Sequence, residues 1–185
     1  MRKFKAFSLL EVAISLTIIG IITMSIVKGL QLLHDAKLEK TTSQIENIKI
    51  AIENFKNTYN QIPGDYSGFA FGNSNQGNDN GIIDENEEKF FWEHLEQAEL
   101  INKKQRSPII GGIFTVKNYE GQNFIIFSGP KGKPFLSLKD ALKIKNKIDG
   151  TIELNYGSVK LVTTKFIKDN ELDHNQKYNL YIEFP

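Results

Sequence analysis

The sequence predicts an α+β fold in which one long N-terminal helix, a membrane span followed by an amphipathic half, packs on a small, mostly antiparallel β-sheet. Three observations support this prediction: an apolar run from Phe7 to Val27, apolar residues at helical spacing from Leu38 to Tyr59, and short alternating segments after Pro108. With 185 residues, of which 40% are hydrophobic, the chain can form one globular domain with an appendage.

The first apolar segment is long enough to cross a membrane. The 21 residues from Phe7 to Val27 would rise about 31 Å as a helix, and the hydrocarbon core of a bilayer is about 30 Å thick. Arg2, Lys3 and Lys5 precede it, which places the N-terminus in the cytoplasm and the remaining chain across the membrane. We therefore expect a single-pass protein in which residues 7–33 are the transmembrane part of the helix.

Glu11 is the one acidic residue within this span. A carboxylate placed in hydrocarbon costs roughly 2.5–3.5 kcal/mol or more, so it needs a partner or a route to water. Two interpretations are open: Glu11 extends toward the headgroups near the helix end, or it pairs with a positive charge at the same depth.

A short motif surrounds Glu11 at the start of the span. The small residue Ala6 precedes the apolar run, so cleavage after Ala6 would remove the basic leader, retain the span and create an α-amine on Phe7. The segment Lys5-Ala6-Phe7-Ser8-Leu9-Leu10-Glu11 resembles the cleavage and methylation signal of the type IV pilin and type II secretion pseudopilin family. Ala6 stands where that family more commonly has Gly.

The resemblance implies both a processing pathway and a function. A prepilin peptidase would remove residues 1–6 and methylate the amine of Phe7, and Glu11 would then neutralise the Phe7 amine of a neighbouring subunit. The resemblance further implies a pilin-like, non-enzymatic filament subunit of the bacterial inner membrane, with a periplasmic globular domain at residues 61–185. Other pilin-like subunits, the prepilin peptidase and the inner-membrane assembly machinery are its expected partners.

Residues 34–60 are predicted to form the amphipathic half of the same helix. Leu38, Ile45, Ile48, Ile52, Phe55 and Tyr59 follow one another at gaps of seven, three, four, three and four. A coiled-coil stalk is the alternative, but fewer than four clean heptads favour packing on the chain's own sheet. The helix should end near Asn60, because Ile62-Pro63-Gly64-Asp65 favours a turn.

Within the membrane span, Gly20 indicates either close helix packing or, by the resemblance, a segment that loses helicity on assembly.

The segment from Gln76 to Glu87 aligns with the EF-hand calcium loop D-x-[DN]-x-[DN]-G-x5-E at every ligand position except the first, where Gln76 replaces Asp. The candidate ligands are Asn78, Asn80, the Ile82 carbonyl, Asp84 and Glu87. Two carboxylates predict weak Ca²⁺ binding, with a Kd of about 10⁻⁴–10⁻³ M. The alternative is a helix N-terminus in which Asp84 is the cap and Glu87 completes a capping box.

The rest of the chain reads as one helix followed by a small sheet with a second short helix. A helix is expected over Asp84–Ile101, with His94 packed among Phe91 and Leu95. The expected strands are Gly112–Val116, Gln122–Phe127, Lys133–Leu136, Thr151–Asn155, Val159–Phe166 and Lys177–Phe184. Between the third and fourth of these, Ser137–Ile148 is expected to be a helix capped by Ser137, with Asp140 in the acidic position of a capping box.

Composition and motifs narrow the function. A net charge of +1 gives no field that would favour nucleic acid, so we expect no nucleic-acid partner. The absence of cysteine excludes thiolate chemistry and the disulfide loop of many major pilins, which favours a pseudopilin or minor pilin. No catalytic motif is present. The alternative is a monomeric, membrane-anchored periplasmic binding module, which would have no use for Glu11.

Overall fold

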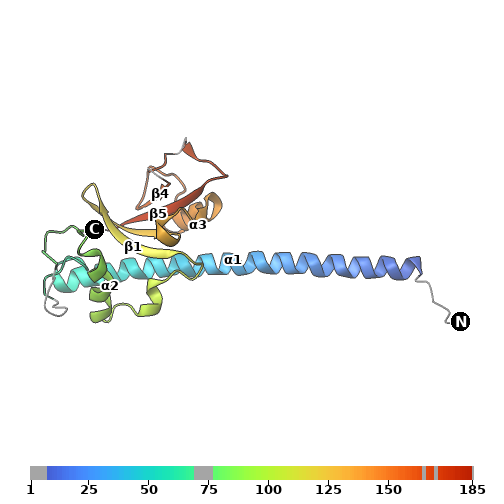
Figure 1. Ribbon diagram of the computed structural model, residues 1–185, viewed down its shortest axis with the longest axis horizontal. Coiled ribbons are helices and arrows are strands. Elements are labelled where there is room, and N and C mark those ends of the chain that lie inside the picture. Colours follow the sequence, from blue (N-terminus) through green and yellow to red (C-terminus); the bar gives the residue numbers. More distant parts are fainter. Residues whose placement is uncertain (1–7, 69–76, 164–165, 169–170, 185) are drawn as a thin grey trace. The chain divides into compact units, whose positions relative to one another are not determined.

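The computed structural model describes residues 8–68, 77–163, 166–168 and 171–184. Figure 1 shows how its helices and strands are arranged. In chain order they are α1 (Leu9–Tyr59), α2 (Glu88–Gln97), the 3₁₀ turn η1 (Lys103–Arg106), β1 (Ile113–Tyr119), β2 (Gln122–Ser128), the 3₁₀ turn η2 (Pro130–Gly132), β3 (Leu136–Ser137), α3 (Leu138–Asp149), β4 (Val159–Val162) and β5 (Lys177–Phe184).

Two compact units divide the chain, Met1–Lys37 and Leu38–Pro185. The described part of the first unit is the exposed beginning of α1, here called the anchor helix (Leu9–Lys37). The second, here called the globular unit, begins at Leu38, the first residue of α1 that is buried. The boundary therefore falls where the amphipathic stripe of α1 begins.

β5 is the strand around which the sheet is organised. β2 pairs with one edge of β5, with Ile125 opposite Ile182, and β1 continues the sheet beyond β2. The other edge of β5 is shared by β3 at its start and β4 along its middle, where Leu161 lies opposite Leu180. All of these pairings are antiparallel, as the alternating pattern predicted.

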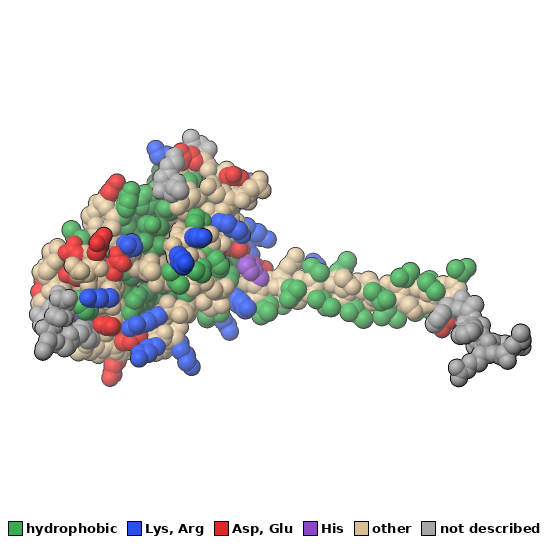
Figure 2. Space-filling view, in the orientation of Figure 1, with side chains coloured by type: hydrophobic (Ala, Val, Ile, Leu, Met, Phe, Trp, Pro, Cys, Tyr) green, Lys and Arg blue, Asp and Glu red, His purple; other side chains and the backbone are tan. Residues whose placement is uncertain are grey.

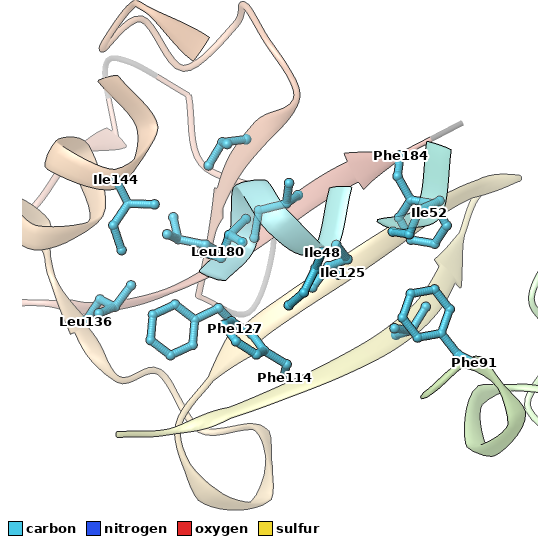
Figure 3. Close-up of a cluster of buried hydrophobic side chains, with 14 of the residues drawn as sticks. Ile48, Ile52, Phe91, Phe114, Ile125, Phe127, Leu136, Ile144, Leu180 and Phe184 are labelled. Atoms are coloured by element: carbon cyan, nitrogen blue, oxygen red, sulfur yellow. The ribbon is translucent and has the colours of Figure 1, made fainter. Parts of the chain in front are cut away.

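The C-terminal half of α1 packs on one face of this sheet. Its residues Ile45, Ile48, Ile52 and Phe55 have no exposed side-chain surface, and the same holds for Ile125, Phe127, Leu180 and Ile182 of β2 and β5. Figure 3 shows Ile48 beside Ile125, with Phe91 of α2 and Ile144 of α3 contributing to the same cluster. Because each fully buried side chain of this size contributes roughly 1.5–3 kcal/mol, the stripe is a major source of stability. The coiled-coil alternative is therefore not what the chain adopts within the globular unit.

The opposite face of the sheet carries a smaller aromatic cluster. Phe124 of β2 is 2% exposed, and its ring lies 5.8 Å from that of Tyr181 and 6.0 Å from that of Phe166. Tyr119, at the end of β1, lies 5.0 Å from Phe166. Side chains alternate across a strand, so β2 and β5 contribute to both the main core and this second layer.

The predicted end of the long helix is confirmed, whereas the second helix is shorter than predicted. Asn60 adopts a left-handed φ of 55° and donates to the Lys56 carbonyl at 2.8 Å. Helix α2 covers Glu88–Gln97 instead of Asp84–Ile101. Residues 84–87 form a separate turn, and Glu99 adopts a φ of 59° that ends the helix before Ile101.

Three predicted strands need correction. Thr151–Asn155 forms no strand, because Thr151 Oγ1 accepts a hydrogen bond from the Glu153 amide and the chain turns there. β3 is limited to Leu136–Ser137, because the Lys133 carbonyl accepts from the Gly129 amide within the preceding turn and Pro134 has no amide hydrogen to donate. β4 ends at Val162, and Phe166 returns to it through an isolated bridge, so the chain reverses within the predicted strand.

Helix α3 and its cap agree with the prediction. Ser137 Oγ accepts from the Asp140 amide at 3.2 Å and donates to the Asp140 carboxylate at 2.7 Å. On its inner face Lys145, with no exposed surface, donates to Asp149 Oδ2 at 2.8 Å and to the Tyr156 and Val159 carbonyls. This buried pair fastens the chain that follows α3, because Asp149 also accepts from the Ser158 and Val159 amides.

We predict that Ile52→Ala lowers the free energy of unfolding of a fragment beginning at Leu38 by about 2–5 kcal/mol, because a fully buried side chain leaves a cavity. Ile50→Ala, two residues away on the same helix but 53% exposed, should change it by less than about 0.5 kcal/mol. Urea denaturation followed by circular dichroism measures both. Equal effects would show that the stripe is not the face that packs on the sheet.

Candidate functional site

The anchor helix is the first candidate site. Among the described residues, α1 is the helix long and apolar enough to cross a membrane, with a mean hydropathy of 2.2 over 18 residues that are not buried within the chain. Its large apolar side chains are exposed on all sides rather than along one stripe, and Figure 2 shows them along the helix. A helix that is apolar all round is suited to lipid or to neighbouring helices.

Four hydroxyl side chains within the anchor helix are internally bonded. Ser15, Thr17, Thr23 and Ser25 each donate to the carbonyl four residues earlier, at 2.8–2.9 Å. Such bonds matter in a bilayer, where no water is available to satisfy a hydroxyl group. These four residues therefore need no partner outside the helix.

Glu11 differs from them. Its carboxylate makes no hydrogen bond or ion pair with any part of the chain that the structure describes, and the residue is exposed. Its backbone amide donates to Ser8 Oγ at 3.1 Å, so Ser8 caps the start of α1. The spacing Ser8-x-x-Glu11 is a capping-box pattern that could have identified this start from the sequence. Glu11 thus presents an unpaired carboxylate at the beginning of an apolar helix.

Two other predicted features of this region remain untested. Ala6 and Phe7, the expected cleavage and methylation residues, lie outside the described residues. Gly20 lies within continuous α1, and an added Cβ would meet no atom within 4 Å, so neither interpretation of this glycine is favoured by the chain alone.

The second candidate site is the loop from Gly77 to Glu87, in which all five predicted ligand residues are joined by hydrogen bonds. Asp84 Oδ2 accepts from the side-chain amides of Asn78, at 2.9 Å, and Asn80, at 3.4 Å. The two oxygens of Glu87 accept from the backbone amides of Asn78 and Asp84 at 2.9 and 3.0 Å. The Ile82 amide donates to Asn80 Oδ1 at 2.7 Å. Gln76 lies outside the described residues.

Half of the alternative capping box forms. Glu87 reaches back to the Asp84 amide, as the third residue of a capping box does, but the Asp84 side chain bonds to Asn78 and Asn80 instead of capping the turn. Glu87 is 4% exposed, and burial raises its pKa, with Asp65 and Asp84 adding like-charge repulsion. Three carboxylates therefore lie near one another in this loop.

Asp65 is the loop residue that the sequence analysis missed. It has no exposed surface, and its carboxylate accepts from the amides of Asn80 at 3.0 Å and Gly81 at 2.7 Å. It follows Pro63-Gly64, eleven residues before Gln76, so spacing along the chain gave no reason to group it with the loop. Among the described residues, no group of three or more His, Cys, Asp or Glu side chains has the geometry to hold a metal ion.

His94 has the packing role that the sequence predicted. It has no exposed surface, lies between the rings of Phe55 and Phe90 at 6.0 and 6.2 Å, and accepts from the Gly64 amide through Nδ1 at 2.9 Å. Burial lowers its pKa to about 4. His94 thereby links α2 to the turn that follows α1.

The comparisons with known proteins give a family match at the N-terminus and a similarity to a solved structure. A family model described as the prokaryotic N-terminal methylation motif matches residues 1–27, which confirms the motif recognised in the sequence. No curated protein matches the chain. Among solved structures, the major type IV pilin PilA1 from Clostridium difficile is similar at 14% identity and a TM-score of 0.47, over 82% of this chain and 96% of that chain. A TM-score below 0.5 is too low to support a conclusion. The motif and the apolar helix together indicate a membrane-anchored protein.

We predict that the globular unit loses stability as the pH falls from 6.5 toward 4. His94 has a folded pKa of about 4 against an ordinary value of 6.5, so over this range the unfolded chain binds a proton that the folded chain does not. The loss should reach about 3 kcal/mol, at about 1.4 kcal/mol per pKa unit. Thermal melts at pH 7, 6 and 5 measure it. His94→Gln, which keeps an acceptor for the Gly64 amide, should reduce the change of melting temperature with pH. If the variant shows the same pH dependence as the wild type, other groups are responsible for it.

Proposed function

We propose that this chain is a structural subunit of a type IV pilus-like or secretion-system pseudopilus filament. The observation that supports this best is the match of residues 1–27 to the N-terminal methylation motif, a segment whose one carboxylate, Glu11, is unpaired within the described structure. The internally bonded hydroxyl groups of the same helix leave Glu11 as the group that needs a partner.

Processing and assembly would follow from these residues. A prepilin peptidase cuts between Ala6 and Phe7 and methylates the new amine, which then lies close in membrane depth to Glu11. An ammonium and a carboxylate are each costly alone in low dielectric, so pairing between neighbouring subunits favours one axial register over others. The anchor helices supply apolar contact, and the Glu11–Phe7 pair determines how far each helix is shifted along its neighbour.

The same proposal assigns a location and a class. The N-terminus is cytoplasmic and the globular unit periplasmic, with the subunit held in the bacterial inner membrane before assembly and in the filament afterwards. The absence of cysteine favours a secretion pseudopilin or minor pilin over a major pilin with a disulfide loop. A monomeric membrane-anchored binding module is the competing proposal, and it gives Glu11 no role.

We also propose that the loop from Gly77 to Glu87 binds calcium weakly. The ligands would be Asn78, Asn80, the Ile82 carbonyl, Asp84 and Glu87. The proposal is supported by the like charges of Asp65 and Asp84 beside Glu87, which a divalent cation would neutralise. Gly81 adopts a φ of 82°, in keeping with the sharp turn at the glycine of a calcium loop. Because hydrogen bonds within the chain already engage Asp84 and Glu87, calcium would have to replace them.

The first prediction concerns the mature N-terminus. Mass spectrometry of protein extracted from membranes of a host with an active prepilin peptidase should find N-methylated Phe7 as the first residue. Removing Arg2, Lys3 and Lys5 also changes the net charge from 23 − 22 = +1 to 20 − 22 = −2. Ala6→Leu, which replaces the small residue before the cut, should leave the leader attached. An intact Met1 in the wild-type protein contradicts the proposal.

The second prediction concerns Glu11. Glu11→Leu should insert normally but lose crosslinking between subunits by more than about tenfold, which corresponds to about 1.4 kcal/mol, because the pairing carboxylate is gone. Thr17→Leu makes the same helix more apolar without removing a charge and should assemble normally. If the Glu11 variant crosslinks as well as the Thr17 variant, the monomeric anchor is the better description.

The third prediction concerns calcium. About 1 mM Ca²⁺ should raise the melting temperature of a fragment beginning at Leu38 by mass action on the folded state, whereas Mg²⁺ should have a smaller effect. Asp84→Asn preserves the shape of the side chain, removes one carboxylate charge and should abolish the Ca²⁺ response. A melting curve that Ca²⁺ leaves unchanged assigns these carboxylates to the hydrogen-bonded turn alone.

A further inference from the structure

The charged side chains of the globular unit are unevenly distributed between its two ends. One end carries α3 and the beginning of β5, and the other carries the loop from Gly77 to Glu87 and the β1–β2 turn. Figure 2 shows basic side chains over the α3 end, whereas acidic side chains gather with some lysines at the other end.

Helix α3 provides the centre of the basic end. Lys139, Lys143 and Lys147 recur every four residues and therefore share one helical face, and all three are exposed. Lys147 pairs with Glu39 near the start of the globular unit, which fixes α3 beside the Leu38 end of α1.

Neighbouring segments add to this surface. Lys177 begins β5 directly opposite Ser137, the cap of α3. The turn that contains η2 carries exposed Lys131 and Lys133 and is attached to β5 by a 2.9 Å bond from Asn179 Nδ2 to the Gly132 carbonyl. The basic end is defined here as Lys131, Lys133, Lys139, Lys143, Lys147 and Lys177.

Several acids near the basic end are engaged within the unit. Glu39 pairs with Lys147, Asp140 bonds to Ser137, and Asp149 is buried against Lys145. Asp173 accepts from the Asn175 amide. Glu39 and Asp149 are therefore each paired with a lysine, and Asp140 is held at the cap of α3.

The acidic end lies at the other end of α1. The Asp79 carbonyl accepts from Gln61 just after α1, at 3.4 Å, and the Gly81 carbonyl accepts from Asn123 at the start of β2, at 3.0 Å. Exposed Glu120 lies in the β1–β2 turn. The acidic end is defined here as Asp79, Asp84, Glu85 and Glu120.

The two ends are too far apart to neutralise each other within one chain. Glu39 and Tyr59 mark them along α1, and the 20 residues of helix from one to the other rise roughly 30 Å at about 1.5 Å per residue. Charges in solution are screened beyond about 8 Å at physiological salt. The charges of one end therefore do not compensate those of the other end within the same chain. They are opposite in sign to the charges at the other end of a second copy.

Resting on the filament proposal, we propose that the acidic end of one globular unit docks on the basic end of the next copy. The two surfaces differ, so the contact is heterologous, and its repetition extends an assembly instead of closing a dimer. Opposite charges steer the two ends together and oppose the reversed, like-to-like orientation.

Engineered cysteines can report this contact, because the chain has no cysteine of its own. Asn86 and Asn146 are exposed, uncharged residues at the acidic and basic ends. The full-length chain carrying Asn86→Cys and Asn146→Cys, assembled in its host and oxidised, should give a ladder of disulfide-linked dimers, trimers and longer species. Each single-cysteine chain is the matched control and should give no ladder.

Charge reversal then tests the cause. In the two-cysteine chain, Lys139→Glu with Lys143→Glu should reduce the ladder at least fivefold, and so should Glu85→Lys with Glu120→Lys. Combining all four reversals in one chain should restore it, which also shows that the substitutions do not prevent folding. Ladders that survive either reversal, or that the fourfold variant fails to restore, overturn the proposal.

The readouts separate this proposal from the filament function. Filaments of methylated subunits that form without the ladder leave the function intact and overturn the end-to-end contact. A wild-type chain that forms no filament and retains Met1 overturns the function itself. If reversal at the basic end releases the chain from anionic phospholipid vesicles but leaves the ladder intact, that surface faces lipid and the proposal is wrong.

Discussion

The burial of one stripe of α1 against the sheet is the interaction on which the globular unit depends. Ile45, Ile48, Ile52 and Phe55 are completely enclosed, and the residues that enclose them come from β2, β5, α2 and α3. Each of those elements has an apolar face that would be exposed without the helix. The same helix continues into the anchor helix. One helix, α1, therefore both organises the core, through its C-terminal half, and indicates attachment to a membrane, through its N-terminal half.

The sequence predicted those parts of the fold that depend on local periodicity. The spacing from Leu38 to Tyr59 predicted the buried stripe, and alternation predicted β5 and the beginning of β4. It failed for Thr151–Asn155, where β-branched and apolar residues suggested a strand. The buried Lys145–Asp149 pair constrains the chain after α3, and from sequence alone that pair is indistinguishable from an ordinary exposed i,i+4 pair.

The candidate sites divide in a similar way. Glu11 was evident from the sequence, because a lone carboxylate in an apolar run violates the surrounding pattern. Ser8 was overlooked, although its spacing to Glu11 is a known capping signal. Asp65 could not have been placed with Asn80 and Gly81, since only the folded turn brings it to their amides. Contacts that span a loop need the fold before they can be recognised.

The position of β5 has a consequence for biosynthesis. This central strand follows β1, β2, β3 and β4 in the sequence and pairs with three of them. The sheet therefore cannot be completed until β5 itself has left the ribosome. The anchor helix, at the beginning of the chain, emerges long before that. During translation the anchor helix can therefore enter a bilayer while the globular unit of the same chain is still an open sheet with unpaired strand edges. Such edges are prone to aggregation, and early tethering at a membrane would keep these unfinished chains apart.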